Sequence, residues 1–278
     1  MEQIVTKTTF QQENIGWKGS RLRCLLLSGL ERNQLQSLLI SIIDQKNPGN
    51  IEIDFTEDFD YFPKGLINPT EVELDKEKRL FRSGEPGIAL NKWWLEKNAR
   101  TPVWDFACNA KIFGTPGLIL VEAKAHRNEL YKVKDASGAK TGSPNRNRIE
   151  EALSIINEKY KLKLSADKYF QLSNRIAWCI KLASLGIPVV LIYLGCLRSE
   201  EMKISKNDTI LESANQWDEI VTTYSKHISF YNWEQSVSGE RLLDDTDRRE
   251  PKCFYPIIRS IDIQLHLSEQ ELNTKYEV

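Results

Sequence analysis

Residues 101–129 contain two carboxylates and one ammonium group, those of Asp105, Glu122 and Lys124. Asp105 stands near the start of one apolar run, and Glu122 and Lys124 interrupt the end of the next. Carboxylate oxygens suit a magnesium ion, and the carbonyl of Ala123 adds a further oxygen ligand. A metal-bound water is a nucleophile for a phosphoryl group, and Lys124 could orient that water or offset charge in the transition state. These residues predict hydrolysis of a phosphodiester bond.

Two predicted strands position these groups. They are the apolar runs 103–112 and 118–125, and the stretch between them contains the turn formers glycine and proline. Glu122 and Lys124 are two residues apart, so on a strand both side chains point to the same face. A hairpin between the two runs would return Asp105 to them. The alternative interpretation is a surface ion pair at a strand end, which is energetically minor.

The rest of the chain predicts an α/β protein. Helices are expected at 33–45, 87–98, 147–161, 168–185 and 208–224. Further strands are expected at 21–27, 51–55, 187–194 and 257–265, with a long loop at 56–84 and irregular structure at 225–250. The run 187–194 is apolar throughout, which is typical of a strand buried on both faces. We expect it beside 118–125 in the sheet, with helix 168–185 on one face. Residues 165–167 are expected to cap that helix, and Gly195 to end the strand.

With these elements in place, the sequence resembles the PD-(D/E)xK nuclease superfamily. The matching residues are Asp105, the strand end Glu122-Ala123-Lys124 and the later helix Gln171-Leu172-Ser173-Asn174-Arg175. The resemblance covers roughly residues 85–196 and is strongest to an uncharacterised bacterial branch. No proline precedes Asp105, which follows Trp104, but that position is variable in the superfamily.

The resemblance implies a restriction-endonuclease-like αβββαβ core with a mixed central sheet at 85–198. It also implies an N-terminal addition at 1–84 and a C-terminal addition at 199–278. The cofactor would be Mg²⁺, with Mn²⁺ as an alternative. The implied metal ligands are Asp105, Glu122 and the carbonyl of Ala123, and the implied catalytic residues are Asp105, Glu122, Lys124, Gln171 and Arg175.

Two further sets of residues are secondary candidates. By resemblance, Glu96, or else Glu85, would add an acidic group from the helix before the catalytic strands, although a solvent-facing glutamate is the alternative. Residues 126–148 carry six lysines and arginines against two acids, which suits contact with a phosphate backbone. Within this segment Lys140, Arg146 and Arg148 are weak nucleic-acid-binding candidates, and an ordinary charged loop is the alternative. His126 follows the end of the predicted strand and is expected to be structural.

Composition narrows the setting. The net charge of −1 over 278 residues argues against a broad basic surface, so a nucleic-acid site must be a local patch. The five cysteines form no CxxC pair and the three histidines are scattered, which disfavours zinc and predicts free thiols in a reducing compartment. No apolar run reaches the ~18 residues of a membrane span, and the N-terminus lacks a signal-peptide core. We therefore expect a cytoplasmic protein without a membrane partner.

The function predicted from the sequence is that of a Mg²⁺-dependent nuclease, with DNA as the expected partner. The alternatives are a nucleic-acid-binding or structural relative of the same fold that has lost catalysis, and an enzyme of another type whose acidic residues coincide by chance. The sequence leaves open DNA or RNA as the substrate, endo- or exonucleolytic cleavage, the sequence specificity and the biological pathway. It also leaves open the oligomeric state, for which a homodimer is one option.

Overall fold

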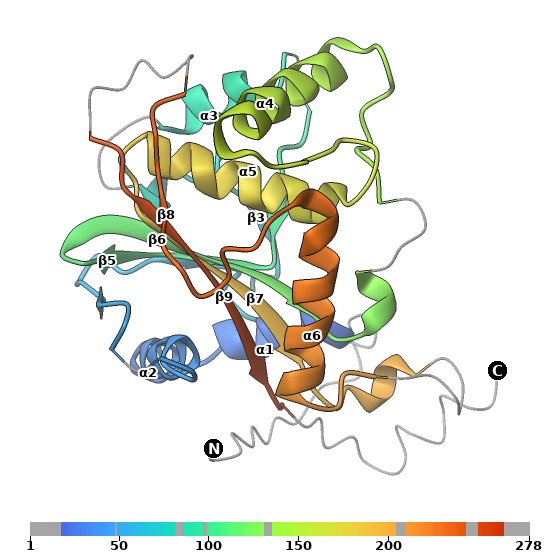
Figure 1. Ribbon diagram of the computed structural model, residues 1–278. Helices are drawn as coiled ribbons and strands as arrows, with labels where there is room; N and C mark the ends of the chain where they lie inside the picture. Colours follow the sequence, from blue (N-terminus) through green and yellow to red (C-terminus); the bar gives the residue numbers. More distant parts are fainter. Residues whose placement is uncertain are drawn as a thin grey trace.

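A mixed β-sheet forms the centre of the molecule, and helices cover both of its faces (Figure 1). The computed structural model describes residues 18–47, 49–81, 86–96, 99–130, 135–203, 210–242 and 250–263. Within them the sheet has the order β1-β5-β6-β7-β9-β8, and β2 also pairs with β5. β5 and β6 are antiparallel, whereas β6, β7 and β9 are parallel to one another. The fold is therefore α/β with a mixed central sheet, as expected.

The strands of this sheet differ greatly in length. The short ones are β1 (Ile53–Asp54), β2 (Tyr61–Phe62) and β8 (Val237–Ser238), and the long ones are β5 (Phe106–Ile112), β6 (Thr115–Lys124), β7 (Val189–Cys196) and β9 (Cys253–Ile261). A separate antiparallel pair joins β3 (Val72–Glu73) to β4 (Val103–Trp104). The segment expected to be a long loop at 56–84 thus contributes β2 and β3.

Two layers of helices enclose the sheet. On one side lie α1 (Gly19–Ser28) and α2 (Arg32–Ile43); on the other lie α3 (Pro86–Trp94), α4 (Pro144–Tyr160), α5 (Phe170–Ser184) and α6 (Ala214–Ser225). Single 3₁₀ turns occur at Lys78–Leu80, Arg127–Glu129, Glu200–Met202 and Lys226–Ile228. Each layer has its own cluster of buried apolar side chains. Both faces of the central strands are therefore covered.

The central strands confirm the predicted architecture. Along β6, Leu118 and Leu120 face the α5 layer, and Ile119 and Val121 face the α1–α2 layer. β6 and β7 are neighbours, with Leu118 paired to Val189. Apolar residues on both faces are what a buried parallel strand requires, which is why the two apolar runs identified this pair.

One predicted strand is wrong. Residues 21–27, expected as a strand, lie inside the helix α1. Six of these seven residues are buried, because the helix packs on the sheet beside β6 and β7. An apolar run this short does not distinguish a buried strand from a buried helix by its periodicity.

The C-terminal part of the chain joins the central sheet. β9 runs parallel to β7 along its whole length. Gly195, expected to end β7, lies inside the strand instead. A side chain there would collide with α6, since a Cβ atom on Gly195 would approach Trp217 Cγ to 2.6 Å. The glycine therefore permits close packing and does not mark a strand end.

The cap of α5 also differs from the prediction. The helix begins at Phe170, after Tyr169 in the left-handed conformation (φ 54°). The carboxylate of Asp135 accepts hydrogen bonds from the backbone N–H of Gln171, at 3.1 and 3.2 Å. A residue from a distant loop thus replaces the expected cap at 165–167.

All five cysteines are free, as predicted. The described helices include none with the length and apolar character that crossing a membrane requires.

Candidate functional site

A tight hairpin places Asp105 beside Glu122. β5 and β6 are joined by Phe113 and Gly114, both with positive φ (48° and 69°), as in the two-residue turns that match the twist of antiparallel strands. Phe106 pairs with Val121 at the end of the ladder, and Asp105, in the bend just before β5, therefore lies beside Glu122. A carboxylate oxygen of Asp105 accepts the backbone N–H of Ala123 at 2.8 Å. The two predicted carboxylates do lie together.

Two cations meet the carboxylate of Glu122. The Lys124 ammonium donates to Oε1 of Glu122 and, at 3.2 Å, to the carbonyl of Ala123. Arg175, from α5, donates through Nε to Oε2 of Glu122 at 2.6 Å. The same guanidinium donates to the carbonyl of Val103 at 2.5 Å and lies over the Trp104 ring, with Cζ 4.5 Å from its centroid. Arg175 therefore ties α5 to the hairpin through the site.

Burial and charge divide the two carboxylates. Glu122 is 1% exposed, and Lys124 and Arg175 are each 5% exposed, whereas Asp105 is partly open to solvent. Burial alone would raise the pKa of Glu122, but Arg175 and Lys124 outweigh it and hold that pKa below its usual value. Burial, and then the charge of Glu122, raise the pKa of Asp105 to about 7. Asp105 is the carboxylate whose charge is poorly compensated.

The oxygen atoms at this point fit a hard divalent cation. In the described part of the chain, no lysine or arginine pairs with Asp105. No cluster of three or more histidine, cysteine, aspartate or glutamate side chains that could hold a metal occurs there either. The candidate ligands are thus the two carboxylates and the carbonyl of Ala123. Magnesium commonly takes one or two carboxylates and completes its shell with water, so this small set is sufficient.

Gln171 lies one turn before Arg175 on α5, half-buried. Its backbone N–H is held by Asp135. Between the described residues, no hydrogen bond joins its side chain to Glu122 or Lys124. Of the two helical residues named from the sequence, only Arg175 contacts the carboxylates.

Glu96 lies away from the cluster. Its carboxylate pairs with Arg148 at 2.9 Å and is more than half exposed. Arg148 also pairs with Glu151 at 3.0 Å. This arrangement agrees with the solvent-facing alternative for Glu96. Glu85, the second candidate, lies outside the described residues.

The expectation that Arg146 contacts phosphate conflicts with its surroundings. Its guanidinium is buried and pairs with Glu150 and Asp167, each at 2.5 Å, and donates to the carbonyl of Ala166 at 3.1 Å. A phosphate contact would break these interactions, so Arg146 has a structural role within α4. Lys140 is exposed, and its candidacy stays a prediction. His126 is buried and accepts the N–H of Asn128 through Nδ1 at 3.0 Å, which agrees with a structural role.

Sequence reasoning missed Tyr193. It pairs with Glu122 in the β6–β7 register and belongs to the buried cluster on the α5 side of the sheet. A tyrosine inside the apolar run 187–194 was the available signal, because its hydroxyl is the only polar side-chain atom of that run.

Comparisons with known proteins identify no relative. No family model, no curated protein and no solved structure matches this chain.

Proposed function

We propose that this protein is a Mg²⁺-dependent nuclease that hydrolyses phosphodiester bonds, with DNA as its expected substrate. The observation that carries the proposal is the placement of Asp105 beside Glu122, with Lys124 and the carbonyl of Ala123 at the same point. The proposal includes a restriction-endonuclease-like core. The order of α3, the β5–β6 hairpin, the helices α4 and α5, and then β7 supports that part of it.

The metal would be held by Asp105, Glu122 and the Ala123 carbonyl. Two carboxylates so close together repel each other, and the pKa of about 7 at Asp105 reflects burial and this repulsion. A divalent cation would remove both penalties. When bound, Mg²⁺ supplies positive charge to the phosphoryl oxygens and lowers the pKa of a bound water.

Lys124 would act as a cation. Burial alone would lower the pKa of its ammonium, but Glu122 and Asp105 raise it above the usual value, so the group keeps its proton. A protonated lysine is a hydrogen-bond donor and is no general base. Its task would be to orient the attacking water or to stabilise charge on the phosphate. Arg175 would hold Glu122 in place through its 2.6 Å hydrogen bond.

A catalytically inactive nucleic-acid-binding relative is the competing function, and one observation favours it. Both oxygens of Glu122 already accept hydrogen bonds from cations, and the group is almost fully buried. In that case the cluster is an internal ion-pair network that joins α5 to the sheet. The partly open position of Asp105 favours the nuclease, because it leaves one ligand reachable from solvent.

The test is a cleavage assay on plasmid, linear duplex and single-stranded DNA and on RNA, with and without Mg²⁺ or Mn²⁺. Three proteins are purified in parallel: the wild type, Asp105→Ala and Asp54→Ala. Asp54 is the matched control. It is an exposed aspartate on β1 of the same sheet, opposite Lys111 in the strand register at the far end of β5. The proposal predicts metal-dependent cleavage by the wild type and the control but not by Asp105→Ala. Equal cleavage by all three would contradict it, and metal-independent binding without cleavage would favour the inactive relative.

A further inference from the structure

Three polar side chains lie at one level of the sheet, one just before β5 and the others on β6 and β7. Asp105 lies beside Glu122, and Glu122 pairs with Tyr193 on β7. The side chains of Glu122 and Tyr193 point to the α5 side, because each shares its strand face with residues of that apolar cluster, such as Leu120 and Leu191. The polar side chains therefore extend one strand beyond the two carboxylates and end at the hydroxyl of Tyr193.

The surroundings of Tyr193 hold its ring firmly. The side chain is fully buried. Its ring stacks on Trp217 of α6, with centroids 5.7 Å apart and planes 7° apart, and it lies 5.7 Å from the Trp233 ring. The indole N–H of Trp217 also donates to the backbone carbonyl of Tyr193 at 3.1 Å. These contacts need the ring and the backbone, but none of them uses the hydroxyl.

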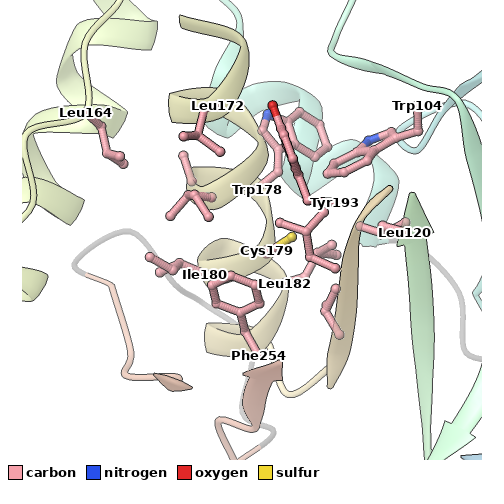
Figure 2. Close-up of a cluster of buried hydrophobic side chains, with 14 of the residues drawn as sticks. Trp104, Leu120, Leu164, Leu172, Trp178, Cys179, Ile180, Leu182, Tyr193 and Phe254 are labelled. Carbon is pink, nitrogen blue, oxygen red and sulfur yellow. The ribbon is translucent and has the colours of Figure 1, made fainter. Parts of the chain in front are cut away.

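The hydroxyl itself has no hydrogen-bond partner among the described residues. Three indole N–H groups of the same buried cluster, on Trp93, Trp104 and Trp178, share this property. Figure 2 shows Trp104, Trp178 and Tyr193 in that cluster. Indole groups only donate, and a phenol hydroxyl can donate. An acceptor is therefore what these groups lack. Buried polar groups without partners are rare in folded proteins and call for a specific explanation.

We propose that the hydroxyl of Tyr193 donates a hydrogen bond to the phosphate group being hydrolysed, on the side of Glu122 away from Asp105. The inference rests on the proposed nuclease function and adds a residue to its site. No proton is transferred: the hydroxyl keeps its hydrogen and stabilises the negative charge on a phosphate oxygen as the bond to the leaving group breaks.

The chemistry of the hydroxyl agrees with a donor role. Burial, and then the negative charge of Glu122, raise the pKa of Tyr193 well above its ordinary value, so the group stays protonated. The protonated phenol adds no negative charge to a site that already holds two carboxylates. A phenylalanine would preserve the stacking on Trp217 without leaving a buried hydroxyl unpartnered. Structure alone therefore gives no reason for a tyrosine here.

The experiment compares Tyr193→Phe with the wild type in cleavage rate and in thermal stability. We expect kcat to fall roughly 10²-fold, as on loss of one charge-stabilising donor, with little change in KM. We expect Tm to rise by roughly 2–4 °C, because the variant no longer buries an unpartnered hydroxyl. Incorporation of p-aminophenylalanine at 193 restores a donor at the same place and should restore most of kcat.

Tyr224→Phe is the matched control for the stability arm. The Tyr224 hydroxyl donates to Asp135 at 3.1 Å, so its loss should lower Tm. This opposite sign shows that the assay reports on hydroxyl pairing within the fold.

Each other result overturns the inference. A Tyr193→Phe protein that cleaves as fast as the wild type removes Tyr193 from the mechanism and leaves the nuclease proposal standing. A lower Tm for Tyr193→Phe shows that the fold already pairs the hydroxyl, and failure of p-aminophenylalanine to restore kcat excludes donation. If the folded wild type cleaves no substrate with any metal, the proposed function and this inference fall together.

Discussion

Two buried groups of charges in this protein are built differently. Arg23 of α1 faces Glu201 with its guanidinium fork, and the backbone N–H of Gly19 adds a hydrogen bond to the same carboxylate at 3.1 Å. Burial alone would raise the pKa of Glu201, but Arg23 outweighs it and the pKa is lowered. At the candidate site, Glu122 is similarly paired, but Asp105 beside it has a raised pKa.

This difference separates a structural ion pair from a candidate active site. One arginine matched to one carboxylate balances both charges. A second carboxylate beside one that is already paired makes the fold less stable unless a cation binds next to it. Groups whose pKa is perturbed by burial and a like charge, at a point that solvent reaches, are typical of functional sites. The surplus carboxylate of Asp105 therefore supports the proposed metal site more than the ion pairs around it do.

The largest expected effect is on stability, at the structural pair. Arg23→Met leaves the Glu201 carboxylate buried without its cation, which should lower the free energy of unfolding by roughly 3–5 kcal/mol. Urea denaturation measures it. The matched control is Arg21→Met on the same helix, where an exposed arginine pairs with Glu71 at 3.5 Å and should contribute about 1 kcal/mol or less. Equal losses in the two variants would contradict a structural role for the buried pair.

The next effect is on catalysis, at the candidate site. Lys124→Ala removes the ammonium group but keeps both carboxylates. The fold should persist, and the rate of cleavage should fall roughly 10²–10³-fold because the charge-stabilising group is lost. Lys124→Arg should recover little of it, since a planar guanidinium does not replace a compact ammonium. Single-turnover rates measure this, with circular dichroism as the check on folding. Arg23→Met, assayed below its Tm, should keep the wild-type rate, and a Lys124→Ala protein as fast as the wild type would refute the mechanism.

A smaller effect concerns pH and Asp105. The folded protein holds the Asp105 proton to about pH 7, whereas an unfolded aspartate releases it near pH 3.9. At this group the folded state thus binds more protons in this window, and the contribution of Asp105 to wild-type stability should decrease as pH rises from about 4 to about 7. Asp105→Asn lacks this loss, so its Tm at pH 8 should exceed that of the wild type by roughly 2–4 °C. Thermal scans at pH 4 and pH 8 measure the change, and a lower Tm for the variant at pH 8 would contradict it.

The smallest effect is the pH dependence of stability at Glu201, and its sign is opposite to that at Asp105. The folded pKa of Glu201 is lowered, so its pair with Arg23 stabilises the protein above the unfolded value near pH 4.3 and loses that contribution as pH falls through the folded value. Glu201→Gln should therefore differ most from the wild type in Tm near neutral pH and least at the acidic end of a pH 3–7 series. A difference that does not change with pH would show that the ion pair is not its source.

The hairpin and its charges were predictable because their signals are local. Two apolar runs around a glycine-containing turn define the hairpin, and its register follows from the two-residue loop. The interruption of an apolar strand by Glu122 and Lys124 was enough to mark the site. β7 was equally clear, because a continuous apolar run is typical of a central strand that is covered on both faces.

The features that the sequence did not reveal depend on distant contacts. Asp135 caps α5 from a loop that precedes α4, and Gly195 stays within β7 because Trp217 covers it. Arg146 looked like a phosphate contact, but Glu150 and Asp167 hold it in a buried network. Spacing along the chain indicates which residues can lie near one another, but the packing decides which charged partner each side chain has in the folded protein.

Calorimetric titration with Mg²⁺ at pH 8 measures the proposed metal site without assuming a substrate. Three folded proteins are compared: the wild type, Asp105→Ala at the candidate site and Glu201→Gln at the structural pair. We expect saturable Mg²⁺ binding in the wild type and in Glu201→Gln, and its loss in Asp105→Ala. Binding that is unchanged in Asp105→Ala, or absent from the wild type, would contradict the assignment of Asp105 and Glu122 as a metal site.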